Sequence, residues 1–297
     1  LRNSFEPTFV PMQLPIGSGE EFEGVVDLVS KKAYIGDSKP SAAPEDMADQ
    51  IEEFRTQVVE YAAESDDDLM MKYFDGETLT ETEIAEGLRQ GIASGRLIPV
   101  YCGAATANIG MKAFMHSIVQ TFPTPAREIV AQNLKEGTEE TLEGKADGPL
   151  AAQVFKTIND QYGKVSYFRV WSGTLESDTR VHNSRAEEEE RLGQAFIPRG
   201  KEQLNVDQVA AGDIAAVVKL SHTQSGDTLC ERSHPLAVPP VKYPEPVYSV
   251  ALAPKTQADT AKMGPSLTRI TEEDPTLRSR YERNTKQSLL EGMGDQH

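Results

Sequence analysis

Lysines that follow a glycine are the first residues of this chain to suggest chemistry, because a Gly-Lys pair at the end of a glycine-rich loop binds nucleotide phosphates. The pairs are Gly144-Lys145, Gly163-Lys164 and Gly200-Lys201. Each lacks the earlier glycine of that loop and the serine or threonine that would bind magnesium. The Asn-Lys-x-Asp and Asp-x-x-Gly-His motifs are also missing. We therefore expect no catalytic residue for phosphoryl transfer and no cofactor in this stretch.

The densest group of carboxylates is the run AEEEER at 186–191. Adjacent residues of a strand point to opposite faces, so the four glutamates do not converge on one ion, and the run is typical of a solvated strand edge or hairpin. Cys102, Cys230 and the five histidines follow no metal-binding spacing. The sequence predicts no metal site, and no acid pair lies in a context that would identify a carboxylate-dependent hydrolase.

The formal net charge of -17 argues against a broad surface for DNA or other duplexes, because such binding depends on Lys and Arg neutralising phosphates. Acidic residues concentrate at 45–90 and 128–147, whereas Lys and Arg recur between 156 and 185. A local basic face is therefore compatible with the composition. No apolar run approaches the roughly 18 residues of a membrane helix, so we expect a cytoplasmic protein with no membrane partner.

Residues 148–230 predict a small antiparallel β-barrel that positions those basic residues. Four stretches alternate apolar and polar residues or cluster β-branched and aromatic ones, with turn residues between them. They are GPLAAQVFKT (148–157), YFRVWSGTLESDTRVHNS (167–184), AGDIAAVVKL (211–220) and SGDTLC (225–230). The side chains that we expect to be largely buried are Val154, Phe155, Phe168, Val170, Ile214 and Val217.

The first part of the chain predicts a mixture of strands and helices. Strands are indicated in 9–35. A helix follows, because Met47, Ile51, Phe54, Val58 and Tyr61 repeat at helical spacing opposite an acidic face, which is typical either of a solvated surface or of a partner-docking helix.

Three more elements follow that helix. Leu69, Met70, Tyr73 and Phe74 predict a short helix, Thr80 with Glu83 predicts a capping box, and LIPVY (97–101) predicts a strand buried on both faces. A helix begins after Gly110 and ends before the prolines at 123 and 125.

The last part of the chain predicts a strand, a helix and a hairpin. PEPVYSVALAPKT (244–256) alternates as a strand, Thr256 can cap the following helix, and Pro265 inside that helix predicts a kink or local irregularity. Two further strands follow Asp274-Pro275. This order is that of the first half of a ferredoxin-like domain.

The order of these stretches resembles translation elongation factor G, the ribosomal translocase. GPLAAQVFKT, FRVWSGTL, AGDIAAVV and SGDTLC resemble its second domain, and GMGDQH (292–297) resembles the GMGELH signature of its third. The resemblance implies an internal fragment of a multidomain α/β and β protein. Residues 1–125 would be the end of a P-loop GTPase domain with its inserted subdomain, 126–147 a linker, 148–240 the barrel and 241–297 part of the ferredoxin-like domain.

The resemblance also implies functional residues. CGAATANIG (102–110) is similar to the family's guanine-recognition loop, with Gly103, Ala104 and Ala105 at its Gly-Ser-Ala positions, so the serine side chain is lost while the Ala105 amide can still donate. Lys164, Arg169 and Arg185 would contact small-subunit ribosomal RNA. The acidic residues Glu52, Glu53 and Glu60 would contact the large-subunit stalk protein. GTP and magnesium would be cofactors of the longer parent protein, which would promote GTP-dependent movement of tRNA and mRNA.

Two departures from the family pattern put a translocase role in question. The turn 160–163 is one residue shorter than is usual in the family, and IPRGKEQ (197–203) replaces a stretch that commonly contains His, Ala, Asn and Lys. Both favour a specialised paralogue. A stand-alone barrel that binds RNA or an oligosaccharide is the alternative function, since small barrels commonly bind such ligands.

Overall fold

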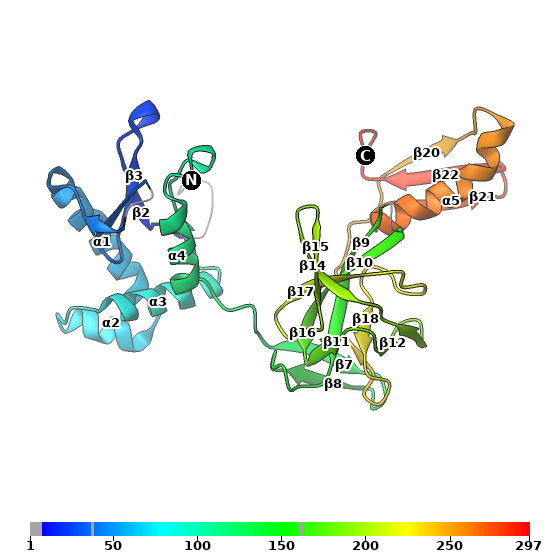
Figure 1. The fold of residues 1–297 in the computed structure, drawn as a ribbon, viewed down its shortest axis with the longest axis horizontal. Coiled ribbons are helices and arrows are strands. Elements are labelled where there is room, and N and C mark those ends of the chain that lie inside the picture. The colour runs from blue at the N-terminus through cyan, green and yellow to red at the C-terminus, as the bar shows by residue number, and fades with distance from the viewer. Residues whose placement is uncertain (1–7, 37–38, 161–162) are drawn as a thin grey trace. The chain divides into compact units, whose positions relative to one another are not determined.

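The structure is a computed structural model, which describes residues 8–36, 39–160 and 163–297, with only the backbone of Asp160. It divides into two compact units, Leu1–Thr124 and Pro125–His297 (Figure 1), called unit 1 and unit 2 below. The turn at 160–163, whose length we compared with the family pattern, contains residues 161 and 162 and lies outside the described residues.

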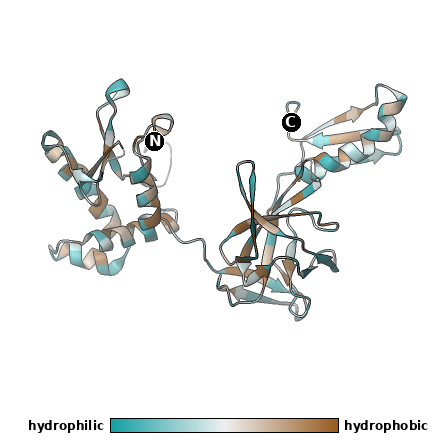
Figure 2. Cartoon of the chain, viewed as in Figure 1, coloured by the Kyte–Doolittle hydropathy of each residue, from teal (hydrophilic) through white to brown (hydrophobic). Residues whose placement is uncertain are grey.

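Unit 1 combines two small sheets with helices (Figure 1). Its strands are β1 Thr8–Pro11, β2 Gln13–Ile16, β3 Gly24–Asp27, β4 Lys32–Ile35, β5 Ser41–Ala42 and β6 Leu97–Val100. Its α-helices are α1 Ala48–Ala63, α2 Asp67–Phe74, α3 Glu81–Ala93 and α4 Met111–Thr121. Strands β2 to β5 form an antiparallel sheet in chain order, and β1 pairs with β6 in parallel. Figure 2 shows hydrophilic and hydrophobic residues alternating along these helices.

The apolar face of α1 packs as its spacing predicts. Ile51 and Val58 are buried, and Met47, Phe54 and Tyr61 pack against the same core. Helix α3 begins at the predicted capping box, in which the Thr80 and Glu83 side chains each bind the other residue's backbone N–H.

Two glycines let α3 approach its neighbours more closely than any other residue would allow. A Cβ on Gly87 would lie 2.3 Å from the carbonyl oxygen of Ala62, at the end of α1. A Cβ on Gly91, one turn later, would lie 2.3 Å from Cδ1 of Leu97. Since real Cβ atoms do not approach heavy atoms this closely, a side chain at position 87 would push against the backbone of α1, and one at position 91 would require the Leu97 and Ser65 side chains to move.

The sequence LIPVY forms a strand as predicted, but the prediction that both of its faces are buried is wrong. Strand β6 exists, but Ile98 and Val100 are 37% and 38% exposed, while Leu97 is buried. Strand β6 pairs only with β1 among the described residues, and this two-stranded sheet has no second layer over Ile98 and Val100. A continuous apolar run is consistent with a strand that is buried on both faces, but it does not by itself show that other elements cover both faces.

Unit 2 starts with strands where we predicted a linker. Strands β7 Ile129–Asn133 and β8 Thr138–Leu142 form a hairpin, to which β19 Leu236–Ala237 adds a third strand. Ala131, Leu142 and Leu236 are buried in its core. The linker prediction for 126–147 is therefore wrong, because the acidic residues belong to a hairpin with an apolar inner face: Glu139 and Glu143 are exposed, and Glu140, opposite Ala131, is half-buried and bonded to Asn133 Nδ2.

The main sheet of unit 2 has eight strands in the order β13-β12-β18-β9-β10-β17-β14-β15, antiparallel throughout. The strands are β9 Ala151–Asp160, β10 Gly163–Ser172, β12 Arg180–Asn183, β13 Glu188–Arg191, β14 Ala195–Arg199, β15 Glu202–Val206, β17 Ile214–Val218 and β18 Thr228–Cys230. Strands β11 Thr174–Glu176 and β16 Gln208–Ala210 form a separate pair. No ladder joins the end strands β13 and β15 among the described residues, so the pairing does not close this sheet as a barrel.

Four of the six side chains predicted to be buried here are buried, namely Val154, Phe168, Val170 and Val217. Phe155 is 40% exposed and Ile214 is 49% exposed, so both predictions were wrong. The reason for Phe155 is that neighbours along a strand face opposite ways, and Val154 already occupies the inner face. Alternation also explains Ile214, since the inward position next to it is Ala215.

The end of unit 2 has the predicted strand, helix and hairpin. The elements are β20 Tyr248–Leu252, α5 Gln257–Glu273, β21 Arg278–Glu282 and β22 Gln287–Gly292. The sheet order β20-β22-β21, with antiparallel pairs, is the order of the first three strands of a ferredoxin-like domain. Thr256 caps α5 in a capping box with Asp259, and the helix runs through Pro265 without interruption.

Candidate interaction sites

The loop after β6 is held by its own backbone. The N–H of Ala104 donates to the carbonyl oxygen of Ile109 at 3.0 Å, and the N–H of Ile109 returns a bond to Ala104 at 3.1 Å. Between them the chain makes a short 3-10 turn, Ala105–Ala107, and Asn108 has a φ of 57°. The two bonds pin the ends of the turn together and so fix the direction of the amides within it.

The amide of Ala105, like that of Thr106, is free for an external acceptor. Both residues are exposed, and their N–H groups bond to no acceptor among the described residues, whereas the N–H groups of Ala107 and Asn108 bond within the turn. Gly103 is exposed as well, and a Cβ there would lie 2.5 Å from Cε of Met111, so another residue at this position would require the Met111 side chain to move. The geometry of the loop is compatible with an amide that binds a carbonyl oxygen of a ligand.

Arg169 is engaged inside unit 2. Its guanidinium lies 4.0 Å from the centre of the Trp171 ring, and its Nη2 donates to the carbonyl oxygen of Pro125 at 2.5 Å. Arg127 lies 5.5 Å from the same ring. Burial, together with the nearby charge of Arg127, lowers the pKa of Arg169. The two arginines hold the start of unit 2 against β10 by cation–π contact.

Arg185 is also engaged, in a bidentate pair with Asp227. Its Nε and Nη2 lie 2.5 and 2.9 Å from the two carboxylate oxygens, and the Asp227 side chain is 3% exposed. Asp227 accepts a further bond from Asn183 Nδ2 at 2.9 Å. The hydrogen bond to Asp227 raises the pKa of Arg185. This arginine neutralises a buried carboxylate, which is a structural role.

Lys164 is the least constrained of the three basic residues predicted to contact RNA. Its Nζ lies 3.9 Å from the Glu272 carboxylate on α5, and its side chain is 17% exposed. All three residues therefore have an intramolecular partner, and they do not form a cluster of free cations.

Glu190, in the run that we interpreted as a solvated edge, is 5% exposed. Its Oε2 accepts the backbone N–H of Ser221 at 2.5 Å and that of His222 at 3.1 Å, and its Oε1 binds the Thr223 hydroxyl. The interpretation was wrong for this one residue. Glu190 faces inward on β13, where the turn after β17 supplies donors, whereas Glu188, two residues earlier on the same face, is exposed at the end of the strand.

Two of the three acidic residues predicted to contact a partner are bound within unit 1. Glu52 pairs with Lys31 at 2.7 Å, and Glu60 accepts the Tyr73 hydroxyl at 3.0 Å. The hydrogen bond from Lys31 lowers the pKa of Glu52. Glu53 is exposed, and its side chain has no ion pair or hydrogen bond among the described residues.

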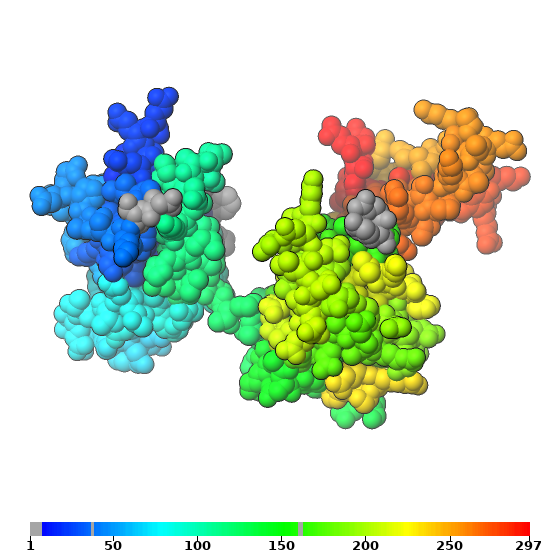
Figure 3. All heavy atoms as spheres, in the orientation of Figure 1, coloured from blue at the N-terminus to red at the C-terminus, as the bar shows by residue number. Residues whose placement is uncertain are grey.

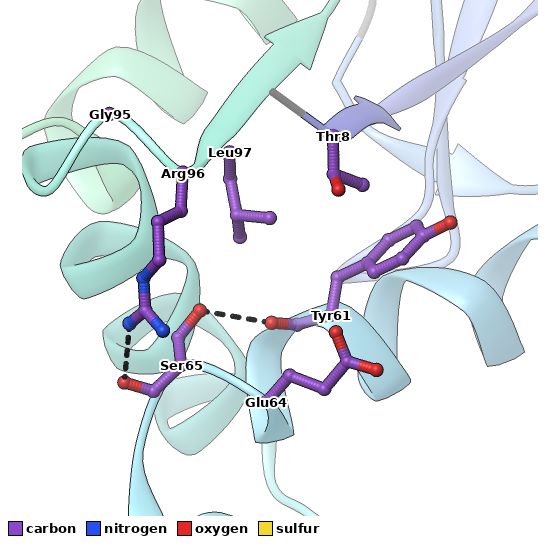
Figure 4. Close-up of a pocket in the computed structure, with 7 residues that line it drawn as sticks. All are labelled: Thr8, Tyr61, Glu64, Ser65, Gly95, Arg96 and Leu97. Carbon is purple, nitrogen blue, oxygen red and sulfur yellow. Dashed lines mark hydrogen bonds between the residues drawn. The ribbon is translucent and has the colours of Figure 1, made fainter. Parts of the chain in front are cut away.

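A pocket of about 410 Å³ lies where α1 ends and β1 and β6 begin (Figure 4). Arg96 donates to the carbonyl oxygen of Ser65 at 3.4 Å, and the Ser65 hydroxyl donates to that of Tyr61 at 3.0 Å. Glu64 lies on the pocket rim with its carboxylate beside Tyr61 (Figure 4). The polar groups here satisfy the carbonyl groups at the end of α1 and do not converge on the cavity.

Two family matches cover most of unit 2. Residues 149–232 match elongation factor G domain 2, and residues 243–297 match elongation factor G domain III. These two parts of the chain are thus similar to domains of elongation factor G. The first match covers most of the eight-stranded sheet, and the second covers β20, α5, β21 and β22.

A solved structure extends the likeness to unit 1. A crystal structure of a protein from Thermus thermophilus aligns with 97% of this chain, at a TM-score of 0.80 and 29% sequence identity. The chain spans 42% of the length of that protein's chain. The match shows that elements of both units, including those outside the two family matches, have counterparts in a longer protein.

Proposed function

We propose that this chain is part of a ribosome-associated translational GTPase of the elongation factor G type. In this role it supplies ribosome contacts and couples domains during GTP-dependent movement of tRNA and mRNA, and it works in the cytoplasm. The presence of domains 2 and III in family order within one chain carries the proposal. Among the described residues no helix is long and apolar enough to cross a membrane.

The residue roles follow from this proposal. The Ala105 amide would bind the guanine base oxygen, with GTP and magnesium held mainly by the GTPase domain of the complete protein. Lys164 is the strongest remaining candidate for a contact with small-subunit RNA, because its ion pair with Glu272 is long. Arg169 and Arg185 would act indirectly, by stabilising the structure of the surrounding surface through their intramolecular bonds. Of the acidic residues, Glu53 is free to contact the stalk protein directly, and Glu52 and Glu60 would have to exchange partners.

Sedimentation with purified ribosomes tests the proposal. The labelled chain should pellet through a sucrose cushion with 70S ribosomes, and elongation factor G bound to a non-hydrolysable GTP analogue should displace it. Pelleting should fall as salt increases, because exposed charges are screened over about 8 Å at physiological ionic strength. An absence of ribosome-dependent pelleting would contradict the proposal. Binding to short RNA or an oligosaccharide without ribosome binding would favour a stand-alone module.

A further inference from the structure

Helix α2 exposes two large apolar side chains that the packing of unit 1 does not use. Met71 is 61% exposed and Phe74 is 78% exposed. Of the four residues whose spacing predicted this helix, Leu69 is buried, Met70 and Tyr73 are half-buried, and Phe74 is exposed. Exposure of a phenylalanine costs hydrophobic free energy that burial would recover.

The two side chains form a single stripe. Asp67, Met71 and Phe74 are spaced at i, i+4 and i+7, which places them on one face of α2, and all three are exposed. In Figure 3 the cyan atoms of this region lie at the surface of unit 1. The two apolar residues, Met71 and Phe74, are spaced at i and i+3, which is one of the spacings of the anchors of an amphipathic helix that docks in a groove.

The surroundings of the stripe are acidic. Asp67, Asp68 and Asp75 are exposed, with no side-chain ion pair among the described residues. The one cation of α2, Lys72, is bound by Glu83. Residues 45–95 hold fifteen acidic and three basic residues. The negative charge of these residues would repel a nucleic acid. The complementary partner is therefore a protein surface with an apolar pocket bordered by lysine or arginine.

We propose that Met71 and Phe74, with Asp67, Asp68 and Asp75 as an acidic rim, form a docking surface for such a basic protein on the ribosome. This proposal rests on the proposed function and makes it more specific. The two apolar side chains supply most of the binding energy, because fully desolvated anchors dominate interfaces. The rim mainly sets the association rate and its dependence on salt.

Helix α4 offers a matched control. Met115 is 61% exposed and Val119 is 79% exposed, at i and i+4 on one face, but α4 contains no acidic residue. Ribosome pelleting is then compared for three full-length chains: the original, M71S/F74S and M115S/V119S. All three should have the same melting temperature, since the altered side chains are exposed. M71S/F74S should bind ribosomes about tenfold more weakly, which corresponds to roughly 1.4 kcal/mol, and M115S/V119S should bind as the original does.

A crosslinking experiment identifies the class of partner. The photoreactive residue p-benzoylphenylalanine at position 74, irradiated with purified ribosomes, should form an adduct with a basic ribosomal protein. An adduct with ribosomal RNA, or equal binding by the original chain and M71S/F74S, would overturn the docking surface while leaving the proposed function intact. Equal weakening by both double variants would also overturn it, because the acidic rim would then confer no selectivity. Failure of the original chain to bind ribosomes would instead contradict the proposed function.

Discussion

The eight-stranded sheet of unit 2 and the helices of unit 1 use charged residues in opposite ways. In the sheet, Asp227 and Glu190 are buried, and each is satisfied by several donors from neighbouring strands and turns. In the helices, the ion pairs Lys31–Glu52 and Lys72–Glu83 lie at the surface. When one partner of a buried hydrogen bond is removed, the other partner stays buried without an acceptor or donor, which costs free energy of folding. When a surface ion pair is removed, water replaces the lost partner and the stability changes little. The comparison shows that Asp227 and Glu190 have structural roles within the sheet, whereas the charges of these helix pairs remain at the surface, where a partner can reach them.

The largest effect is expected in the core of the sheet. Phe168→Ala should destabilise unit 2 by about 3–5 kcal/mol, because Phe168 is fully buried and the truncation leaves a cavity. Phe155→Ala is the matched control on the adjacent strand, and it should cost much less since Phe155 is 40% exposed. Urea denaturation monitored by circular dichroism measures both. Similar losses for the two variants would mean that the inner and outer faces of β9 are assigned incorrectly.

Removal of a buried carboxylate should have the next largest effect. Asp227→Ala leaves Asn183 Nδ2 and the Arg185 guanidinium without their common acceptor, and it should cost roughly 1–3 kcal/mol. The control is Glu53→Ala on α1, which is exposed and should change stability within about 0.5 kcal/mol. The same denaturation assay applies. Equal stability of the Asp227 variant and the original chain would contradict the structural role of the Arg185 pair.

Two glycine substitutions distinguish close helix packing from ordinary helix propensity. Gly87→Ala should destabilise unit 1 by about 1–3 kcal/mol, because its new Cβ would meet the Ala62 carbonyl. Gly264→Ala should stabilise α5 by about 0.5–1 kcal/mol, since nothing lies within 4 Å of a Cβ there and alanine favours a helix. Thermal melting should shift in opposite directions. A shift to higher temperature for both would show that α3 is not held close to α1.

The smallest effect concerns the capping box of α3. The hydrogen bond from Lys72, with those from Thr80, lowers the pKa of the Glu83 carboxyl from 4.5 to about 2. Because the folded-state pKa is depressed, the stabilising contribution is present above the unfolded value near 4.5 and is lost as the pH falls towards 2. Carbon-detected NMR titration should give a Glu83 midpoint close to 2 at low salt, shifting upward in Lys72→Ala. A midpoint at the ordinary value in the original chain would contradict the capping geometry.

The sequence by itself determined the elements and their order. Helical spacing located α1, a capping box located the start of α3, and alternation with turn residues located the long strands of unit 2. It also revealed the resemblance to elongation factor G in the two domains that the family matches cover. These signals are local, since propensity, caps and period depend on neighbours within a few residues.

Only the tertiary structure decided which faces are covered and which charges are free. Phe155 and Phe74 carry strong apolar signals, yet both are exposed, because the core positions nearby are filled by Val154 and Leu69. Glu190 lies in a run of identical residues, and only the turn at 221–223 distinguishes it from its neighbours. The partners of Arg169 and Arg185 are 44 and 42 residues away in the chain. Burial and pairing depend on segments that are distant in sequence, and no local pattern encodes them.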